Sequence, residues 1–198
     1  MDTLEISSED REWLQKITKL FRRPKAPIEI FYDLCFCICA PQATHRNNLE
    51  MVQELVDLGY YDNDVSLEQL EAICKKVRFK KKASYLQKAK EQFPEILEKL
   101  NSDESESSKR EWLVKNVSGL GYKTASHLLR NLGASSLAII DVHILKFLGK
   151  KTPSNKKAYL NLEKKFKEIA SQYQLSPSEL DSFIWKIYSN TAWEKFIY

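Results

Sequence analysis

The sequence predicts an all-α protein, and two observations support that prediction. Apolar residues recur at steps of three and four along almost every segment of the 198-residue chain, which is the spacing of one face of an α-helix. Most of these runs also begin with a residue suited to capping a helix. With 43% hydrophobic residues, the chain can bury a core that does not depend on disulfides.

The composition excludes membrane-spanning proteins but few other classes. The formal net charge of +4 gives a mildly basic surface, which suits nucleic acid but also many ordinary proteins. No apolar run approaches the ~20 residues that cross a bilayer. The start MDTLEISSED lacks the basic-then-apolar layout of a signal peptide. We therefore expect a cytoplasmic protein with no membrane partner.

The first informative segment is the apolar stretch DLCFCICA, which contains three of the four cysteines. The four are Cys35, Cys37, Cys39 and the distant Cys74. Their spacing matches neither a zinc site nor a ferredoxin-like cluster. The large apolar residues between them favour reduced cysteines in a core, although C-x-C-x-C could bind a soft metal if it were exposed.

Three helices are predicted to begin at a serine followed three residues later by Glu or Gln, the capping-box pattern. These pairs are Ser66 with Gln69, Ser108 with Glu111, and Ser176 with Glu179. A longer helix near residues 155–173 places its apolar side chains on one stripe, with its lysines and glutamates facing away. The acidic segment NSDESESS at 101–108 is expected to be a solvated loop.

The densest basic run surrounds Phe79. It consists of Lys75, Lys76, Arg78, Lys80, Lys81 and Lys82. Two interpretations remain open: a solvated helix end and turn, or a surface that contacts phosphates.

A glycine turn between two amphipathic helices carries most of the functional information. Only five glycines occur in the chain, and Gly119 and Gly121 follow Ser118 in the stretch from Trp112 to Gly133. Glycine permits positive φ and close approach of backbone N–H groups to a ligand, so this turn suits an anion such as a DNA phosphate. Similar turns also join ordinary antiparallel helices.

Lys123 follows this turn and lies off the apolar stripe of its own helix. The stripe consists of Ala125, Leu128, Leu129 and Leu132. Lys123 is expected on the opposite face with His127 and Arg130. It is either an ordinary solvated charge or a nucleophilic amine, because a helix N-terminus, a neighbouring arginine and any burial would disfavour its protonated form.

Asp141 immediately precedes another apolar-periodic helix, in the segment AIIDVHIL. The position predicts an N-cap. A capping carboxylate is also suited to opposing a positive charge that develops on a sugar. The structural and the catalytic interpretations of Asp141 are therefore compatible.

The segments GLGYKTAS and IDVH together resemble the motif of the helix-hairpin-helix DNA glycosylase superfamily. The resemblance implies two helical lobes beside a DNA cleft, over residues 26–134 and over 1–25 plus 135–198. It also implies phosphate binding by Ser118, Gly119 and Gly121. In the same superfamily, the residue at Lys123 forms a Schiff base and the one at Asp141 is essential.

The resemblance extends to three further positions. Gln42, in PQATHRNN, matches the residue that fills the gap left by a flipped base, while Phe79 and Trp185 match aromatic residues that could sandwich that base. Trp185 also fits a core stripe. The cysteine pattern excludes the iron–sulfur branch, and the segment LDSFIWKIY is similar to the prokaryotic type-2 branch of 8-oxoguanine glycosylase/lyases.

This resemblance implies a base-excision-repair enzyme that removes 8-oxoguanine and cleaves the strand by β-elimination. It would act as a monomer on damaged double-stranded DNA in the nucleoid, with no metal or other cofactor. The alternatives are a glycosylase/lyase for another oxidised base and a noncatalytic DNA-binding module. The module predicts salt-dependent binding without strand scission.

Overall fold

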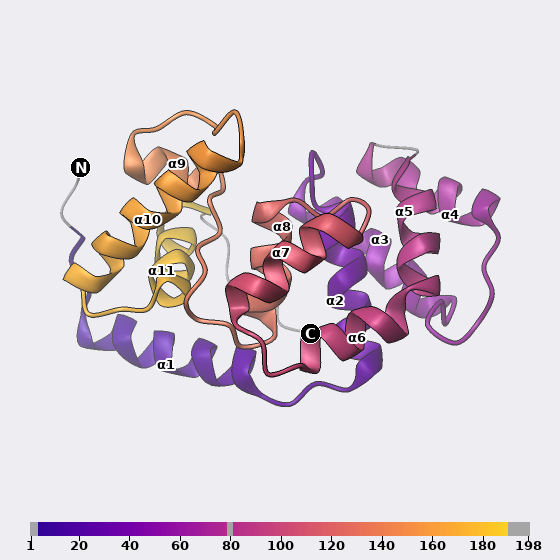
Figure 1. Ribbon diagram of the computed structural model, residues 1–198, viewed down its shortest axis with the longest axis horizontal. Helices are drawn as coiled ribbons and strands as arrows, with labels where there is room; N and C mark the ends of the chain where they lie inside the picture. The colour runs from indigo at the N-terminus through magenta and orange to yellow at the C-terminus, as the bar shows by residue number, and fades with distance from the viewer. Residues whose placement is uncertain (1–3, 79–80, 190–198) are drawn as a thin grey trace. The chain divides into compact units, whose positions relative to one another are not determined.

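The computed structural model describes residues 4–78 and 81–189, and every regular element within these ranges is helical (Figure 1). The prediction of an all-α protein is confirmed. The chain divides into two compact units. Unit 1 comprises Met1–Arg23 with Gly133–Tyr198, and unit 2 comprises Pro24–Leu132.

Unit 2 is built around α2 (Pro27–Cys39), which contacts α3 (His45–Asp57), α5 (Lys81–Glu91), α6 (Phe93–Asn101) and α8 (Tyr122–Asn131) (Figure 1). The remaining elements are α4 (Leu67–Cys74), the short 3₁₀ helix η1 (Lys75–Val77) and α7 (Glu106–Asn116). The last turns of α2 are apolar on all sides because neighbouring helices cover them.

All four cysteines are buried and free, which confirms that they belong to the core. Burial raises the pKa of the Cys35 and Cys37 thiols well above their ordinary value, so both are neutral thiols.

Unit 1 is built around α11 (Pro177–Ser189), which contacts α1 (Ser8–Arg22), α9 (Val142–Leu148) and α10 (Lys156–Gln172). Lys186 of α11 donates to Asp10 Oδ1 of α1 over 3.0 Å. Asp10 also completes a capping box with Ser7 at the start of α1. None of the described helices has the length and apolar content needed to cross a bilayer.

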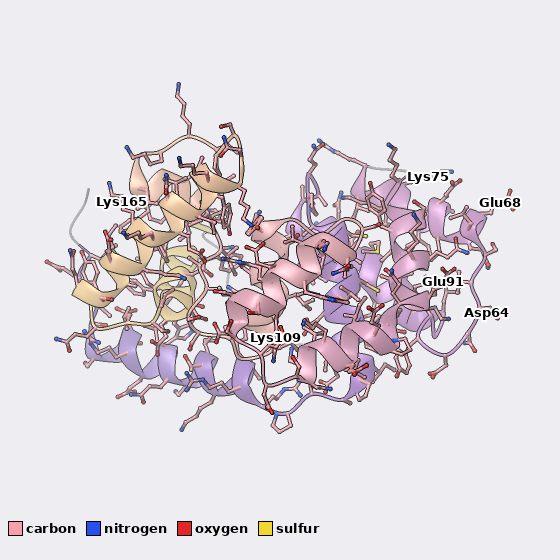
Figure 2. All side chains as sticks on the ribbon, viewed as in Figure 1. Asp64, Glu68, Lys75, Glu91, Lys109 and Lys165 are labelled. Atoms are coloured by element: carbon pink, nitrogen blue, oxygen red, sulfur yellow. The ribbon has the colours of Figure 1, made fainter. Side chains whose placement is uncertain are left out.

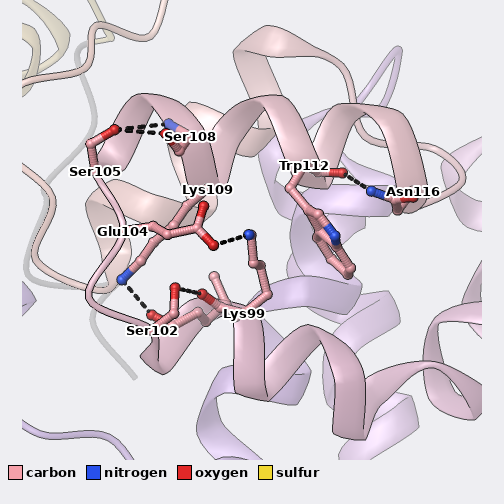
Figure 3. Close-up of polar contacts among 9 residues, drawn as sticks. Lys99, Ser102, Glu104, Ser105, Ser108, Lys109, Trp112 and Asn116 are labelled. Carbon is pink, nitrogen blue, oxygen red and sulfur yellow. Dashed lines mark hydrogen bonds and ion pairs between the residues drawn. The ribbon is translucent and has the colours of Figure 1, made fainter.

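Two of the three predicted capping boxes are confirmed. Ser66 accepts from the Gln69 N–H, and Ser176 accepts from the Glu179 N–H, each over 3.2 Å. The predicted start at Ser108 is wrong, because Ser105 caps α7 by accepting the Ser108 N–H over 3.2 Å (Figure 3). Only Ser108 has Glu three positions later, but Ser105 caps the helix without that reciprocal bond, so the capping-box pattern placed the start three residues too late.

The acidic connector is consequently shorter than the predicted loop at 101–108, since only residues 102–105 lie between α6 and α7. Figure 3 shows how it is held. Lys109 Nζ donates to the Leu100 carbonyl over 2.8 Å, and Lys99 pairs with Glu104. The connector is therefore a short turn that these side-chain contacts of Lys99 and Lys109 hold between α6 and α7.

The long helix α10 confirms the prediction near 155–173, with Asn155 as its N-cap. One part of that prediction is wrong: Glu163 does not face away but is 3% exposed. Its carboxylate accepts the Ala138 N–H over 3.0 Å, while the Tyr159 hydroxyl donates to the Ala138 carbonyl over 3.0 Å. Tyr159 also accepts the Ile140 N–H over 3.2 Å. These bonds satisfy the backbone of a buried, non-helical segment.

Candidate active site

The predicted hairpin is present in unit 2: α7 ends at Asn116, and α8 begins at Tyr122 with Gly121 as its N-cap. The Val117 N–H donates to the Leu113 carbonyl over 2.9 Å, and the Leu120 N–H to the Val117 carbonyl over 3.2 Å. Val117 and Leu120 are buried. The turn is thus fixed by its own backbone bonds and by two apolar anchors.

Gly119 and Gly121 of the hairpin differ in backbone conformation and in surroundings, so each position favours glycine for a different physical reason. Gly119 has φ +91°, and a Cβ there would lie 2.8 Å from Tyr85 Cδ2 and 3.1 Å from Ile38 Cγ2. Gly121 has no neighbour within 4 Å of such an atom, and its N–H donates to Thr124 Oγ1 over 3.0 Å. Gly119 is therefore required by the turn, whereas Gly121 leaves an open surface at the start of α8, where first-turn N–H groups lack intrahelical acceptors.

A matched pair of variants separates these roles. We expect Gly119→Ala to lower the free energy of unfolding by ~2–4 kcal/mol, since it combines positive φ with a clash. Gly121→Ala should lower it by no more than ~1 kcal/mol. Urea unfolding measures both, and DNA binding at two salt concentrations tests whether Gly121→Ala weakens phosphate contact. Equal destabilisation by the two would contradict this division.

Lys123 is the second residue of α8 and its side chain is exposed, while Ala125, Leu128 and Leu129 are buried. The expectation that Lys123 lies off the core face is confirmed. Arg130 was expected on the same face but is only 7% exposed. The reason is that α8 packs against both α2 and α7, so its buried arc is wider than one stripe.

His127 is also packed rather than solvated, with its ring 5.8 Å from that of Phe36 in an edge-to-face contact. Its pKa lies well below the ordinary value of 6.5, because burial and then the positive charges of Arg130 and Lys123 disfavour the imidazolium. His127 is therefore a neutral neighbour of Lys123.

This lowered pKa predicts a pH dependence of stability. Below a pH of about 6.5 the unfolded chain binds a proton at His127 that the folded protein does not, so stability falls as the pH falls. We expect His127→Gln to remove part of that loss, a slope of at most ~1.4 kcal/mol per pH unit. Urea unfolding of both proteins on either side of this pH measures it. An unchanged slope in the variant would assign the dependence to other groups.

Asp141, in unit 1, is the N-cap of α9, which confirms its predicted structural role. Its Oδ1 accepts the N–H groups of His143 and Ile144 over 2.9 and 3.0 Å. None of the described residues donates to Oδ2. The preceding segment is the one held by Tyr159 and Glu163. Asp141 is therefore fixed from both sides, with one carboxylate oxygen left for another partner.

Of the two aromatic residues predicted to stack on the flipped base, only Trp185 lies within the described residues. Trp185 of α11 is partly exposed, and its ring makes an edge-to-face contact with His143 at 6.4 Å between centroids. It therefore lies beside the helix that Asp141 caps. Phe79 lies outside the described residues.

Gln42 is exposed at the turn between α2 and α3 and has φ 61°, in the left-handed region. The Ala43 N–H donates to the Ala40 carbonyl over 3.2 Å, and Thr44 caps α3. The expected polar tip is therefore a tight turn with Gln42 at its apex.

The described residues of the basic run, 75–78 and 81–82, do not form one surface. Lys75, Lys76, Arg78 and Lys81 are exposed, and exposed side chains such as Lys75 and Glu68 extend from this part of unit 2 into solvent (Figure 2). Lys76 pairs with Glu54. Lys82, by contrast, is 4% exposed. Neither interpretation of the run holds for Lys82, because its charge is inside the protein. The sequence offered no signal for this difference.

Among the described residues, no group of three or more His, Cys, Asp or Glu side chains is placed to hold a metal ion. The polar chemistry of the chain thus centres on the hairpin lysine in unit 2 and the capped aspartate in unit 1.

An all-helical chain with this Gly-x-Gly hairpin, a lysine in the next helical turn and an aspartate capping a later helix is a helix-hairpin-helix protein of the DNA glycosylase class. Within that class, the chain belongs to the 8-oxoguanine DNA glycosylase family, whose model matches residues 12–175.

Relatives match over most of their length. The 8-oxoguanine DNA glycosylase/AP lyase of Methanocaldococcus jannaschii is 35% identical, with 90% of each chain covered. That of Thermoplasma volcanium is 37% identical, with 88% of this chain and 86% of the relative covered. The crystal structure of the M. jannaschii 8-oxoguanine glycosylase/lyase with a 15mer DNA containing 8-oxoguanine has a TM-score of 0.82, 33% identity and 93% coverage of both chains.

Proposed function

We propose that this protein excises 8-oxoguanine from double-stranded DNA and then cleaves the strand at the abasic site. The observation that carries the proposal is the exposed Lys123 in the first turn of α8, directly after the open surface at Gly121. Membership of the 8-oxoguanine DNA glycosylase family and the names of the relatives supply the substrate.

Lys123 acts as the nucleophile. Its neutral amine attacks C1′ of the flipped nucleotide, the bond from C1′ to the base breaks, and the base leaves with a proton. Ring opening of the sugar gives a Schiff base between Nζ and C1′. Loss of a C2′ proton then expels the 3′ phosphate by β-elimination.

Asp141 supports the attack. Its Oδ1 is occupied by the α9 cap, so Oδ2 is the oxygen that faces the positive charge developing on the sugar. Fixing one oxygen orients the other without further loss of side-chain freedom. No step requires a metal or other cofactor.

The remaining predicted residues bind and open the duplex. The hairpin at Ser118, Gly119 and Gly121 grips a phosphate, which positions the DNA without reading its sequence. Gln42 fills the gap left by the extruded nucleotide, and Trp185 with Phe79 stacks on the base. The lobes at residues 26–134 and at 1–25 plus 135–198 act together as a monomer in the cytoplasm, where nucleoid DNA lies.

Strand cleavage over a panel of duplexes tests this function. The panel contains 8-oxoguanine, an oxidised pyrimidine, an abasic site and undamaged DNA, each with and without borohydride. We expect cleavage and covalent trapping with 8-oxoguanine and the abasic site. Cleavage of the abasic duplex alone would retain the lyase and discard the base assignment. Salt-dependent binding with no scission anywhere would identify a noncatalytic module.

A further inference from the structure

Lys82 is a buried cation held entirely by backbone carbonyls. Its side chain is 4% exposed, and Nζ donates to the carbonyls of Cys39, Pro41 and Val77 over 2.6, 2.7 and 2.7 Å. A lysine ammonium has three N–H donors, so all three are used. None of the described carboxylates forms an ion pair with it. Cys39 ends α2, where the helix dipole favours a positive charge.

Two of these three carbonyls directly precede residues with left-handed backbone. The Pro41 carbonyl belongs to the peptide that leads into Gln42, with φ 61°, and the Val77 carbonyl to the peptide that leads into Arg78, with φ 70°. No other described non-glycine residue of unit 2 has positive φ. One ammonium therefore fixes the peptide planes at both unfavourable turns.

Burying the Lys82 ammonium and holding two non-glycine residues at positive φ are both unfavourable in free energy. We therefore expect the arrangement to have a role beyond packing. Burial lowers the pKa of Lys82, because the charged form loses its hydration. Left-handed conformations of bulky residues persist only where the surroundings determine them. Charge-assisted bonds to carbonyls are strong enough to do so. The unfavourable desolvation of the Lys82 ammonium is thus accompanied by a structural gain, because its three hydrogen bonds hold two turns in one defined geometry.

We propose that Lys82 is a positioning residue for duplex opening: it locks the Gln42 turn and the Arg78 turn together, so that both present their side chains to DNA in a single arrangement. The proposal rests on the proposed function, in which Gln42 replaces the extruded nucleotide. A residue that enters a base stack must already be rigid, because a small displacement of a positioned group lowers the rate strongly. Lys82 itself touches no DNA and acts through the peptide before Gln42.

The inference predicts a split between two substrates. Excision of 8-oxoguanine from a duplex requires opening of the stack, whereas Schiff-base formation by Lys123 on a single-stranded abasic oligonucleotide does not. Lys82→Met keeps the length of the side chain but removes the donors. We expect it to lower single-turnover excision from the duplex by ~30- to 100-fold. Borohydride trapping on the single-stranded abasic site should stay within ~3-fold of the parent.

A matched control and a milder variant keep the test decisive. Lys88→Met alters an exposed lysine of the same helix and should behave as the parent. Lys82→Arg retains the charge but cannot place three donors at one point, so it should fold and show a smaller loss confined to the duplex. In the Gln42→Ala background, Lys82→Arg should cause little further loss, because both changes act on one step.

Fluorescence of 2-aminopurine placed beside the lesion measures opening of the stack without any chemistry. We expect Lys82→Arg to weaken this signal and the Lys88 control to preserve it. Equal losses on duplex and single-stranded substrates, or additive losses with Gln42→Ala, would overturn the positioning role. A parent protein that cleaves no lesion duplex would overturn the proposed function and this role with it. If the parent protein cleaves the lesion duplex and the Lys82 variants cleave it equally well, only the positioning role of Lys82 would be overturned.

Discussion

Lys123→Gln is expected to abolish both strand cleavage and borohydride trapping on 8-oxoguanine duplexes, lowering the single-turnover rate by at least ~10³-fold. The amide cannot attack C1′ or form a Schiff base. Because Lys123 is exposed and lies off the core face of α8, the free energy of unfolding should change by less than ~0.5 kcal/mol. Gel-resolved single-turnover cleavage and urea unfolding measure the two quantities.

The control is Lys88→Gln, which removes one positive charge from another exposed position of unit 2. It separates loss of a nucleophile from loss of net charge. The Lys123 variant should still bind the duplex with nearly the parent's affinity. Cleavage by Lys123→Gln at the parent's rate would show that another group attacks the sugar, and the assigned mechanism would then be wrong.

Asp141→Asn is expected to lower excision by ~10²- to 10³-fold while leaving stability almost unchanged. Asparagine caps a helix about as well as aspartate, so the bonds to His143 and Ile144 can persist while the negative charge is lost. Asp141→Ala removes cap and charge together. It should lose as much activity and also ~0.5–2 kcal/mol of stability.

Comparing the two Asp141 variants isolates the charge from the cap. Rates are measured at saturating enzyme, and unfolding is followed by urea. If Asp141→Asn is fully active and only Asp141→Ala is impaired, then Asp141 serves the fold and has no electrostatic role in the reaction. If both are inactive with different stabilities, the carboxylate acts on the substrate independently of its capping function.

The sequence by itself determined the features that depend on near neighbours. Helical class, the hairpin turn and the caps at Ser66 and Asp141 follow from interactions between residues two to four positions apart, which a linear pattern displays directly. The start of α7 was placed wrongly, because Ser108 has the capping-box pattern with Glu111 whereas the actual N-cap, Ser105, lacks it.

Only the tertiary structure decided which charged side chains are buried and which are exposed. The sequence pattern placed Glu163 and Arg130 away from the apolar stripes of their helices and left Lys82 in a basic run, yet all three are buried. Lys82 meets a carbonyl 43 positions away, and Glu163 meets an N–H 25 positions away. A charge is stable inside a protein only with such partners, and backbone groups carry no residue identity that a sequence could reveal. Periodicity therefore locates helices, whereas the packing of helices within each unit determines which polar side chains are buried.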